Sequence, residues 1–114
     1  FALWDGQGLQ LPSRSPAAKG YVGDISAGPA GSFYLASERA HQVLRWWPRA
    51  GAELQTVGEL ERAGALAPWS VDGLDGVFIA SARGVARWHP LQAPRMLRWP
   101  LPMALDNHWV PLHG

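Results

Sequence analysis

The chain has 114 residues, a formal net charge of +1 and a charged fraction of 17%, below the roughly 25% usual for globular domains. Its ten Lys and Arg residues are scattered rather than gathered into a stripe, so no nucleic-acid partner is expected. The absence of Cys excludes disulfides and thiol catalysis, and no apolar run reaches the ~18 residues expected of a membrane span.

Strands joined by turns are expected along the whole chain, because ten Pro and thirteen Gly interrupt short apolar stretches at close intervals. The first segments predicted to be strands are residues 1–5 and 9–11. A set of four expected strands follows at 21–27, 33–37, 43–47 and 53–60. A second set of four is expected at 65–71, 77–82, 85–88 and 95–99.

Residues 54–65 leave an alternative open. The run Glu59-Leu60-Glu61-Arg62-Ala63 is composed of residues that favour helices. A short helix there would replace the outer strand of the first set.

A repeat with a period of about 42 residues connects the two sets. Trp4, Trp46 and Trp88 stand 42 residues apart in similar local sequence, and Phe33–Ser37 recurs as Val77–Ser81 with an offset of 44. This period is the blade length of WD-repeat β-propellers. We therefore expect an all-β fold, a β-propeller with WD-repeat-like blades, in which the repeated Trp packs one blade against another.

The chain is too short to complete such a ring, since propellers close with about 4–8 blades. Residues 1–12 are expected to end one blade, 21–60 and 64–101 to form two full blades, and 105–112 to be a closing or next inner strand. The chain begins inside a repeat, so we expect a piece of a longer protein, with closure by self-assembly as the alternative. Alone, it would expose blade faces and self-associate.

Three short motifs resemble part of a bacterial protein family. They are Tyr21-Val22-Gly23-Asp24-Ile25, Gly28-Pro29-Ala30-Gly31 and Asp106-Asn107-His108. These segments are similar to the C-terminal part of a domain-of-unknown-function family of exported, seven-bladed propeller-like proteins. Members are often encoded near imelysin-type iron-uptake proteins. The resemblance runs from about Tyr21 to Leu112 and implies a periplasmic setting and a link to iron or copper-redox physiology.

Asp106, Asn107 and His108 form the most suggestive polar cluster. On an extended strand Asp106 and His108 share a face, where a carboxylate and an imidazole can bind a metal or act as acid and base. Asp24 stands at the matching place of the first full blade, so Asp24, Asp106 and His108 are expected to converge near the ring axis. Asp106 and His108 are therefore candidate metal ligands for iron or copper, with Asp24 and Asn107 as candidate binding residues. Alternatively, the Asp-Asn pair forms a turn and His108 cross-links strands.

The remaining histidines, arginines and serines are expected to have structural roles rather than catalytic or metal-binding ones. His41, His89 and His113 do not have a recognised metal spacing, and His89 is expected at an exposed strand end. Arg45 and Arg87 each precede a repeated Trp, and a cation–π contact with an adjacent blade is expected of them. No Ser has a nucleophile-elbow context and no Gly-rich segment has the features of a phosphate loop, so catalysis is not expected.

Two functions of different class follow from these features. The first is a non-catalytic binding platform in an exported bacterial protein, with another protein as its partner. The alternative is a metal-binding or metal-dependent propeller with its site at the channel mouth. The platform predicts that His108 is hydrogen-bonded inside a blade, whereas the metal site predicts that Asp106 and His108 face the channel.

Overall fold

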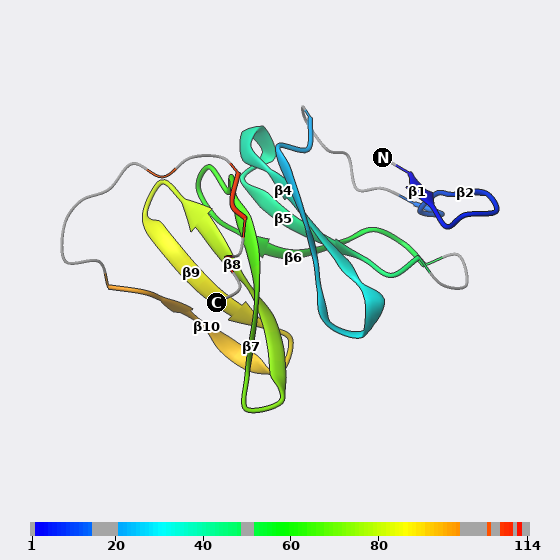
Figure 1. The fold of residues 1–114 in the computed structure, drawn as a ribbon. Helices are drawn as coiled ribbons and strands as arrows, with labels where there is room; N and C mark the ends of the chain where they lie inside the picture. The colour runs from blue at the N-terminus through cyan, green and yellow to red at the C-terminus, as the bar shows by residue number, and fades with distance from the viewer. Residues whose placement is uncertain are drawn as a thin grey trace.

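The computed structural model describes residues 2–14, 21–48, 52–98, 105, 108–110 and 112. They form an all-β fold with three antiparallel sheets, none of which closes on itself (Figure 1). The N-terminal hairpin pairs β1 (Leu3–Trp4) with β2 (Leu9–Gln10). Within the described residues, no helix is long and apolar enough to cross a membrane.

The central sheet is a four-stranded meander in which each strand pairs with the next one along the chain. Its strands are β3 (Asp24–Ala27), β4 (Phe33–Ser37), β5 (Gln42–Trp46) and β6 (Gln55–Glu59). Two short 3-10 turns, η1 (Pro29–Gly31) and η2 (Glu38–Ala40), separate the first three strands. Strand β4 is almost wholly buried, as its continuous apolar sequence predicts.

The C-terminal sheet repeats this meander. Its strands are β7 (Leu66–Val71), β8 (Leu74–Ser81), β9 (Gly84–His89) and β10 (Gln92–Met96). Phe33 pairs with Trp46 in the central sheet, and Val77 pairs with Trp88 in the C-terminal sheet. The sequence repeat therefore corresponds to two sheets of the same strand order and register.

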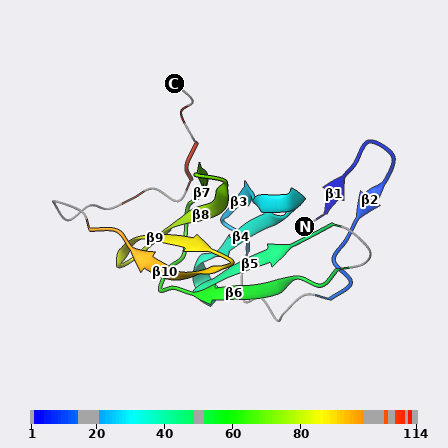
Figure 2. The ribbon, with the colours of Figure 1, turned by 90° about the horizontal axis from the view of Figure 1, so that it is seen from below.

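The three sheets lie in chain order across the molecule, with the central sheet in the middle (Figures 1 and 2). The core between the two larger sheets consists of Tyr34, Ala36, Val43, Ala63, Leu66, Val77, Ile79 and Ala86. A second cluster, on the other face of the central sheet, consists of Leu35, Leu44, Trp46 and Leu54, with Leu3 of the hairpin packed against it. The central sheet is thus covered on both faces.

The repeated Trp residues face the same way along this stack. Trp46 is 2% exposed and packs toward the hairpin, whereas Trp88 packs toward the central sheet. Each therefore contacts the sheet that precedes its own. Trp4 has no preceding sheet among the residues that the structure describes, and it is 62% exposed.

Several predicted strands differ in extent from those observed. Strand β8 begins at Leu74 rather than Val77, because Asp72 and Gly73 both have positive φ and turn the chain in two residues. The inner strand begins at Asp24 rather than Tyr21, and β10 covers 92–96 rather than 95–99. The helix considered for 54–65 is absent, since residues 55–59 pair with β5 as strand β6.

The predicted strand over 105–112 is not found in the part of the tail that is described. Leu105, residues 108–110 and Leu112 belong to no strand. Residues 106, 107 and 111 lie outside the described residues, as does His113.

Candidate functional site

Two of the four predicted site residues meet in the structure. Asp24 is the first residue of β3, and its side chain is buried where the central and C-terminal sheets join. His108 Nδ1 lies 2.7 Å from Asp24 Oδ1, although the His108 side chain is 65% exposed. The other two candidates, Asp106 and Asn107, fall outside the described residues.

A backbone group completes this cluster. Asp24 Oδ2 accepts a hydrogen bond from the backbone N–H of Leu66, the first residue of β7, at 2.7 Å. Leu66 lies 42 residues after Asp24, and His108 lies 84 residues after it. The partners of Asp24 therefore follow it by one and two sequence periods, and the carboxylate connects three segments that are far apart in the sequence.

The geometry fixes how the imidazole is oriented. A carboxylate oxygen accepts hydrogen bonds, so the proton of this contact is on Nδ1 of His108. The other ring nitrogen, Nε2, takes no part in this hydrogen bond. A carboxylate-oriented imidazole of this kind is found both in general bases and in metal-ligating histidines, and equally in purely structural cross-links.

The described residues do not assemble a metal site around the pair. No group of three or more His, Cys, Asp or Glu side chains among them could hold a metal ion. Both oxygens of Asp24 already accept hydrogen bonds, one from Leu66 and one from His108. Of the two predicted metal ligands, Asp106 and His108, the structure describes only His108. The carboxylate that contacts His108 belongs to Asp24.

The histidines outside this site have local structural contacts. His41 adopts the left-handed conformation, and its Nδ1 accepts the backbone N–H of Arg62 at 2.9 Å. His89 is at the end of a strand, β9, as predicted, but the prediction that it is exposed is wrong. His89 is 7% exposed, packs against Trp69 with tilted rings whose centroids are 5.9 Å apart, and accepts the N–H of Leu91. The Trp69 ring of β7 lies against the His89 ring, a contact between distant residues that the sequence alone does not indicate.

Each of the two repeated arginines stacks on a tryptophan, although these tryptophans stand at different places in the repeat. Arg45 lies 3.9 Å from the ring centre of Trp47 and 5.8 Å from that of Trp88 in the neighbouring sheet. The predicted cation–π contact between repeats is thus confirmed for Arg45. Arg87 lies 3.8 Å from the ring of Trp69 in its own sheet.

Tyr34 lies in the core beside these groups. Its ring meets Trp88 edge-on at 5.3 Å, and its hydroxyl is buried without a hydrogen-bond partner. Burial raises the pKa of Tyr34 above 10.0, and the nearby Arg45 guanidinium opposes this rise. This tyrosine is therefore a core residue that stays neutral at physiological pH.

Asp5 is the acidic residue of the N-terminal hairpin, and it closes the turn between β1 and β2. Its carboxylate accepts the backbone N–H groups of Gln7 and Gly8, each at 2.9 Å, and the side-chain amide of Gln10. These hydrogen bonds lower the pKa of Asp5, so it stays ionised at neutral pH.

No protein-family model, curated protein or solved structure matches this chain. The resemblance to the exported bacterial family therefore stays a prediction, carried only by the three short motifs.

Proposed function

We propose that this chain forms part of a β-propeller and acts as a non-catalytic binding platform for another protein. The observation that carries the proposal is the use of both Asp24 oxygens to join Leu66 and His108. The pair is thereby occupied in holding three repeats together near the inner strands. The periplasmic setting and the link to iron uptake enter the proposal from the family resemblance.

The stacking of the sheets supports the propeller part of the proposal. Two four-stranded meanders of equal strand order pack face to face, and their first strands, β3 and β7, lie side by side. In a propeller the first strand of each blade lines the central channel. Asp24 and His108 would then lie at the channel, with Asp24 acting as a tie between blades.

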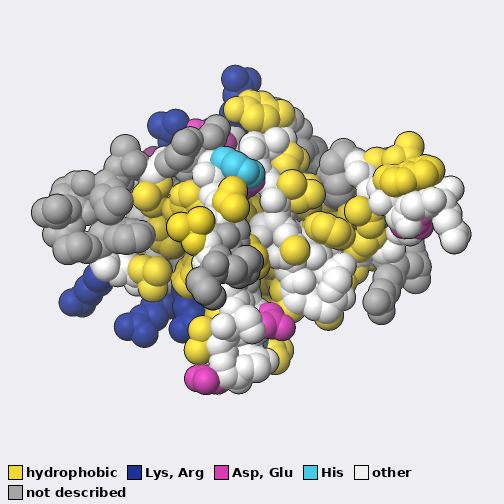
Figure 3. Space-filling model, viewed as in Figure 1, with side chains coloured by type: hydrophobic (Ala, Val, Ile, Leu, Met, Phe, Trp, Pro, Cys, Tyr) yellow, Lys and Arg dark blue, Asp and Glu magenta, His cyan; other side chains and the backbone are white. Residues whose placement is uncertain are grey.

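Exposed apolar side chains next to the pair support the platform part. Ile25 follows Asp24, Val110 follows His108 by two residues, and both are more than half exposed. Figure 3 shows a histidine side chain on one face of the molecule with hydrophobic side chains around it. Apolar groups gathered on a surface are typical of sites that bind another protein.

The experiment that tests this proposal compares metal content and stability in the same preparations. The full chain is purified without chelator beside Asp24→Asn and His108→Ala, and metal is measured by mass spectrometry with urea unfolding in parallel. We expect no stoichiometric metal in any of the three proteins. We expect Asp24→Asn to lower the free energy of unfolding by about 1–3 kcal/mol, because a buried hydrogen-bonded charge is lost.

His108→Ala serves as the matched comparison. It should lower the free energy of unfolding by about 1 kcal/mol or less, since the imidazole is largely exposed and Leu66 keeps its acceptor. One equivalent of metal in the wild type, lost in His108→Ala without unfolding, would overturn the platform proposal.

That outcome would support a second candidate, a metal-binding propeller with iron or copper at the channel mouth. One observation favours it: the exposed His108 ring uses Nδ1 for Asp24 and leaves Nε2 for a ligand. A carboxylate behind a ligating histidine is the common arrangement at metal centres. Asp106, two residues earlier, would supply a second ligand.

A further inference from the structure

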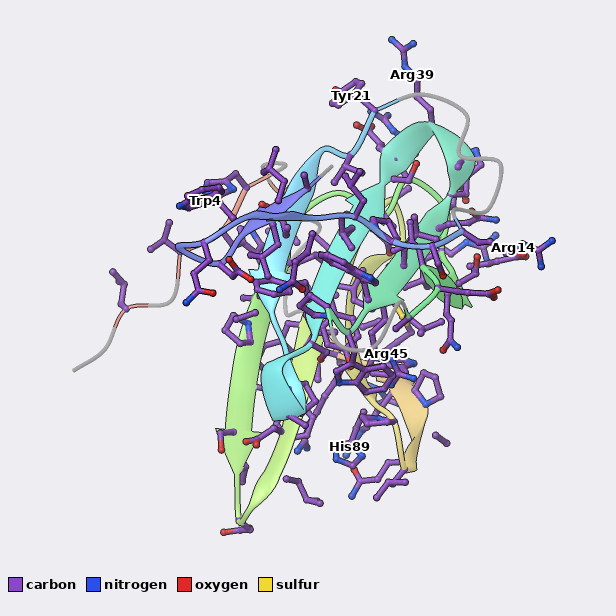
Figure 4. All side chains as sticks on the ribbon, turned by 90° about the vertical axis from the view of Figure 1, so that its right-hand side faces the viewer. Trp4, Arg14, Tyr21, Arg39, Arg45 and His89 are labelled. Atoms are coloured by element: carbon purple, nitrogen blue, oxygen red, sulfur yellow. The ribbon has the colours of Figure 1, made fainter. Side chains whose placement is uncertain are left out.

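The stack of sheets ends in two faces that have no partner sheet in the described part of the chain. At one end, the outer face of the N-terminal hairpin carries Trp4, Leu9 and Leu11, and all three are more than 60% exposed. Figure 4 shows Trp4 on this hairpin, in a different part of the molecule from Arg45 and His89. At the other end is the face of the C-terminal sheet turned away from the central sheet.

The interface between the central and C-terminal sheets shows what kind of surface would fit the outer face of the hairpin. Trp88 of the C-terminal sheet packs against Tyr34 and Arg45, which are opposite each other on β4 and β5 of the central sheet. Trp4 occupies the place of Trp88 in the repeat. A face bearing an aromatic residue opposite an arginine is therefore the expected partner of Trp4.

The far face of the C-terminal sheet has this composition. Phe78 and Arg87 are opposite each other on β8 and β9, at the repeat positions of Tyr34 and Arg45. Ala86 and Trp88 face the central sheet, so alternation along β9 directs Arg87 to the opposite side. Arg87 is partly exposed and stacks on Trp69 as Arg45 stacks on Trp47, at 3.8 and 3.9 Å.

The charges of the two faces are also complementary. Arg95 lies directly opposite Arg87 on β10, and neither arginine has an ion pair among the described residues. Figure 3 shows basic side chains gathered at the lower left, beside β9 and β10. The hairpin carries the ionised Asp5 next to Trp4 and has no Lys or Arg between residues 2 and 13.

We infer that the chain binds a second copy of itself head to tail, with the Trp4 face of one copy on the Phe78–Arg87 face of the next. The predicted propeller already implies that the isolated chain self-associates, and this inference specifies the two surfaces that meet. The faces differ, so the contact is heterologous, and copies add in one direction until a ring closes or a filament grows. The contact repeats the one already present between the central and C-terminal sheets.

The test is sedimentation velocity on the full chain with two variants, Trp4→Ser and Arg87→Ala, alone and mixed. The wild type should form oligomers whose size grows with concentration. Each variant has lost one face and should associate roughly tenfold or more weakly. Mixed in equal amounts, the two should form a complex of one copy each, because Arg87 of the first meets Trp4 of the second.

Matched controls are Tyr21→Ser, which removes an exposed aromatic residue elsewhere, and Arg39→Ala, which removes its stacked cation. Both should associate like the wild type. A monomeric wild type, variants that associate undiminished, or a mixture that stays monomeric would overturn the inference. Trp4→Ser alone suffices should Arg87→Ala fail to fold, since Trp4 lies outside the core. None of these outcomes bears on the metal content that tests the proposed function.

Discussion

At the scale of single residues, polar groups inside this fold differ in whether they have partners. Asp24 uses both carboxylate oxygens, whereas the Tyr34 hydroxyl and the Trp69 indole N–H are buried without a hydrogen-bond partner. Replacing a buried polar group that has no hydrogen-bond partner costs little stability. Removing one partner of a hydrogen-bonded pair costs more, because the other partner stays buried without a hydrogen bond. Tyr34 and Asp24 should therefore respond very differently to substitution.

Tyr34→Phe should leave the free energy of unfolding at pH 7 within about 1 kcal/mol of the wild type. Its effect should appear in alkali. Burial raises the pKa of Tyr34 above 10.0, so the folded chain keeps a proton that the unfolded chain loses first. Unfolding then releases a proton, and wild-type stability falls as the pH rises through and beyond 10.0. Urea unfolding of both proteins from pH 7 upward measures this, and parallel curves would contradict it.

Residue types in the sequence indicated part of the site. Asp24 and His108 can be predicted, because each belongs to a polar motif near an expected inner strand. The sequence does not indicate the role of the Leu66 backbone, because every residue type except Pro carries the same N–H group. The repeat period held the missing signal, since Leu66 and His108 follow Asp24 by 42 and 84 residues.

At the scale of elements, local turn geometry decided where strands begin. Both Gly73 and Gly76 lie between the strands expected at 65–71 and 77–82. Gly73 has the positive φ expected of a turn glycine, whereas Gly76 lies inside strand β8 opposite Trp69. Composition could not separate these two glycines. Their difference comes from the tertiary packing around Gly76, where a Cβ would meet the Trp88 carbonyl oxygen and the Trp69 ring.

Gly76→Ala should lower the free energy of unfolding by about 1–3 kcal/mol, because a backbone oxygen and a buried indole cannot both move aside. Gly58→Ala is the matched control on strand β6, where a Cβ would meet nothing within 4 Å. That change should be neutral or stabilise the protein by up to ~1 kcal/mol, since Ala restricts the unfolded chain. Chemical unfolding decides the matter, and equal effects at both sites would count against the packing described.

At the scale of the whole molecule, position in the stack determines what a repeated residue does. Trp4 and Trp46 hold the same place in the sequence repeat, yet one is exposed and the other is buried. The period predicted the stacking, and the register of the two large sheets agrees with it. The sequence could not tell which Trp lacks a neighbour, because exposure depends on the order of sheets in space.

Trp46→Ala should therefore lower the free energy of unfolding by about 3–5 kcal/mol, since it empties the cluster between the hairpin and the central sheet. Trp4→Ala should change it by about 0.5 kcal/mol or less when measured at dilution. Denaturant curves at low protein concentration provide the comparison. Similar losses for the two variants would mean that the hairpin face is buried in the monomer.

The backbone ladders of the two large sheets join only strands that follow one another along the chain. During translation, the central sheet has all of its ladder partners once Glu59 has emerged from the ribosome, before β7 has emerged. Asp24 is different, because its partners belong to later segments. One carboxylate oxygen of Asp24 binds Leu66 and the other binds His108. Because Leu66 is synthesised before His108, the two partners become available in that order. Asp24 therefore gains its full set of hydrogen bonds only after the segment that carries His108 has been made.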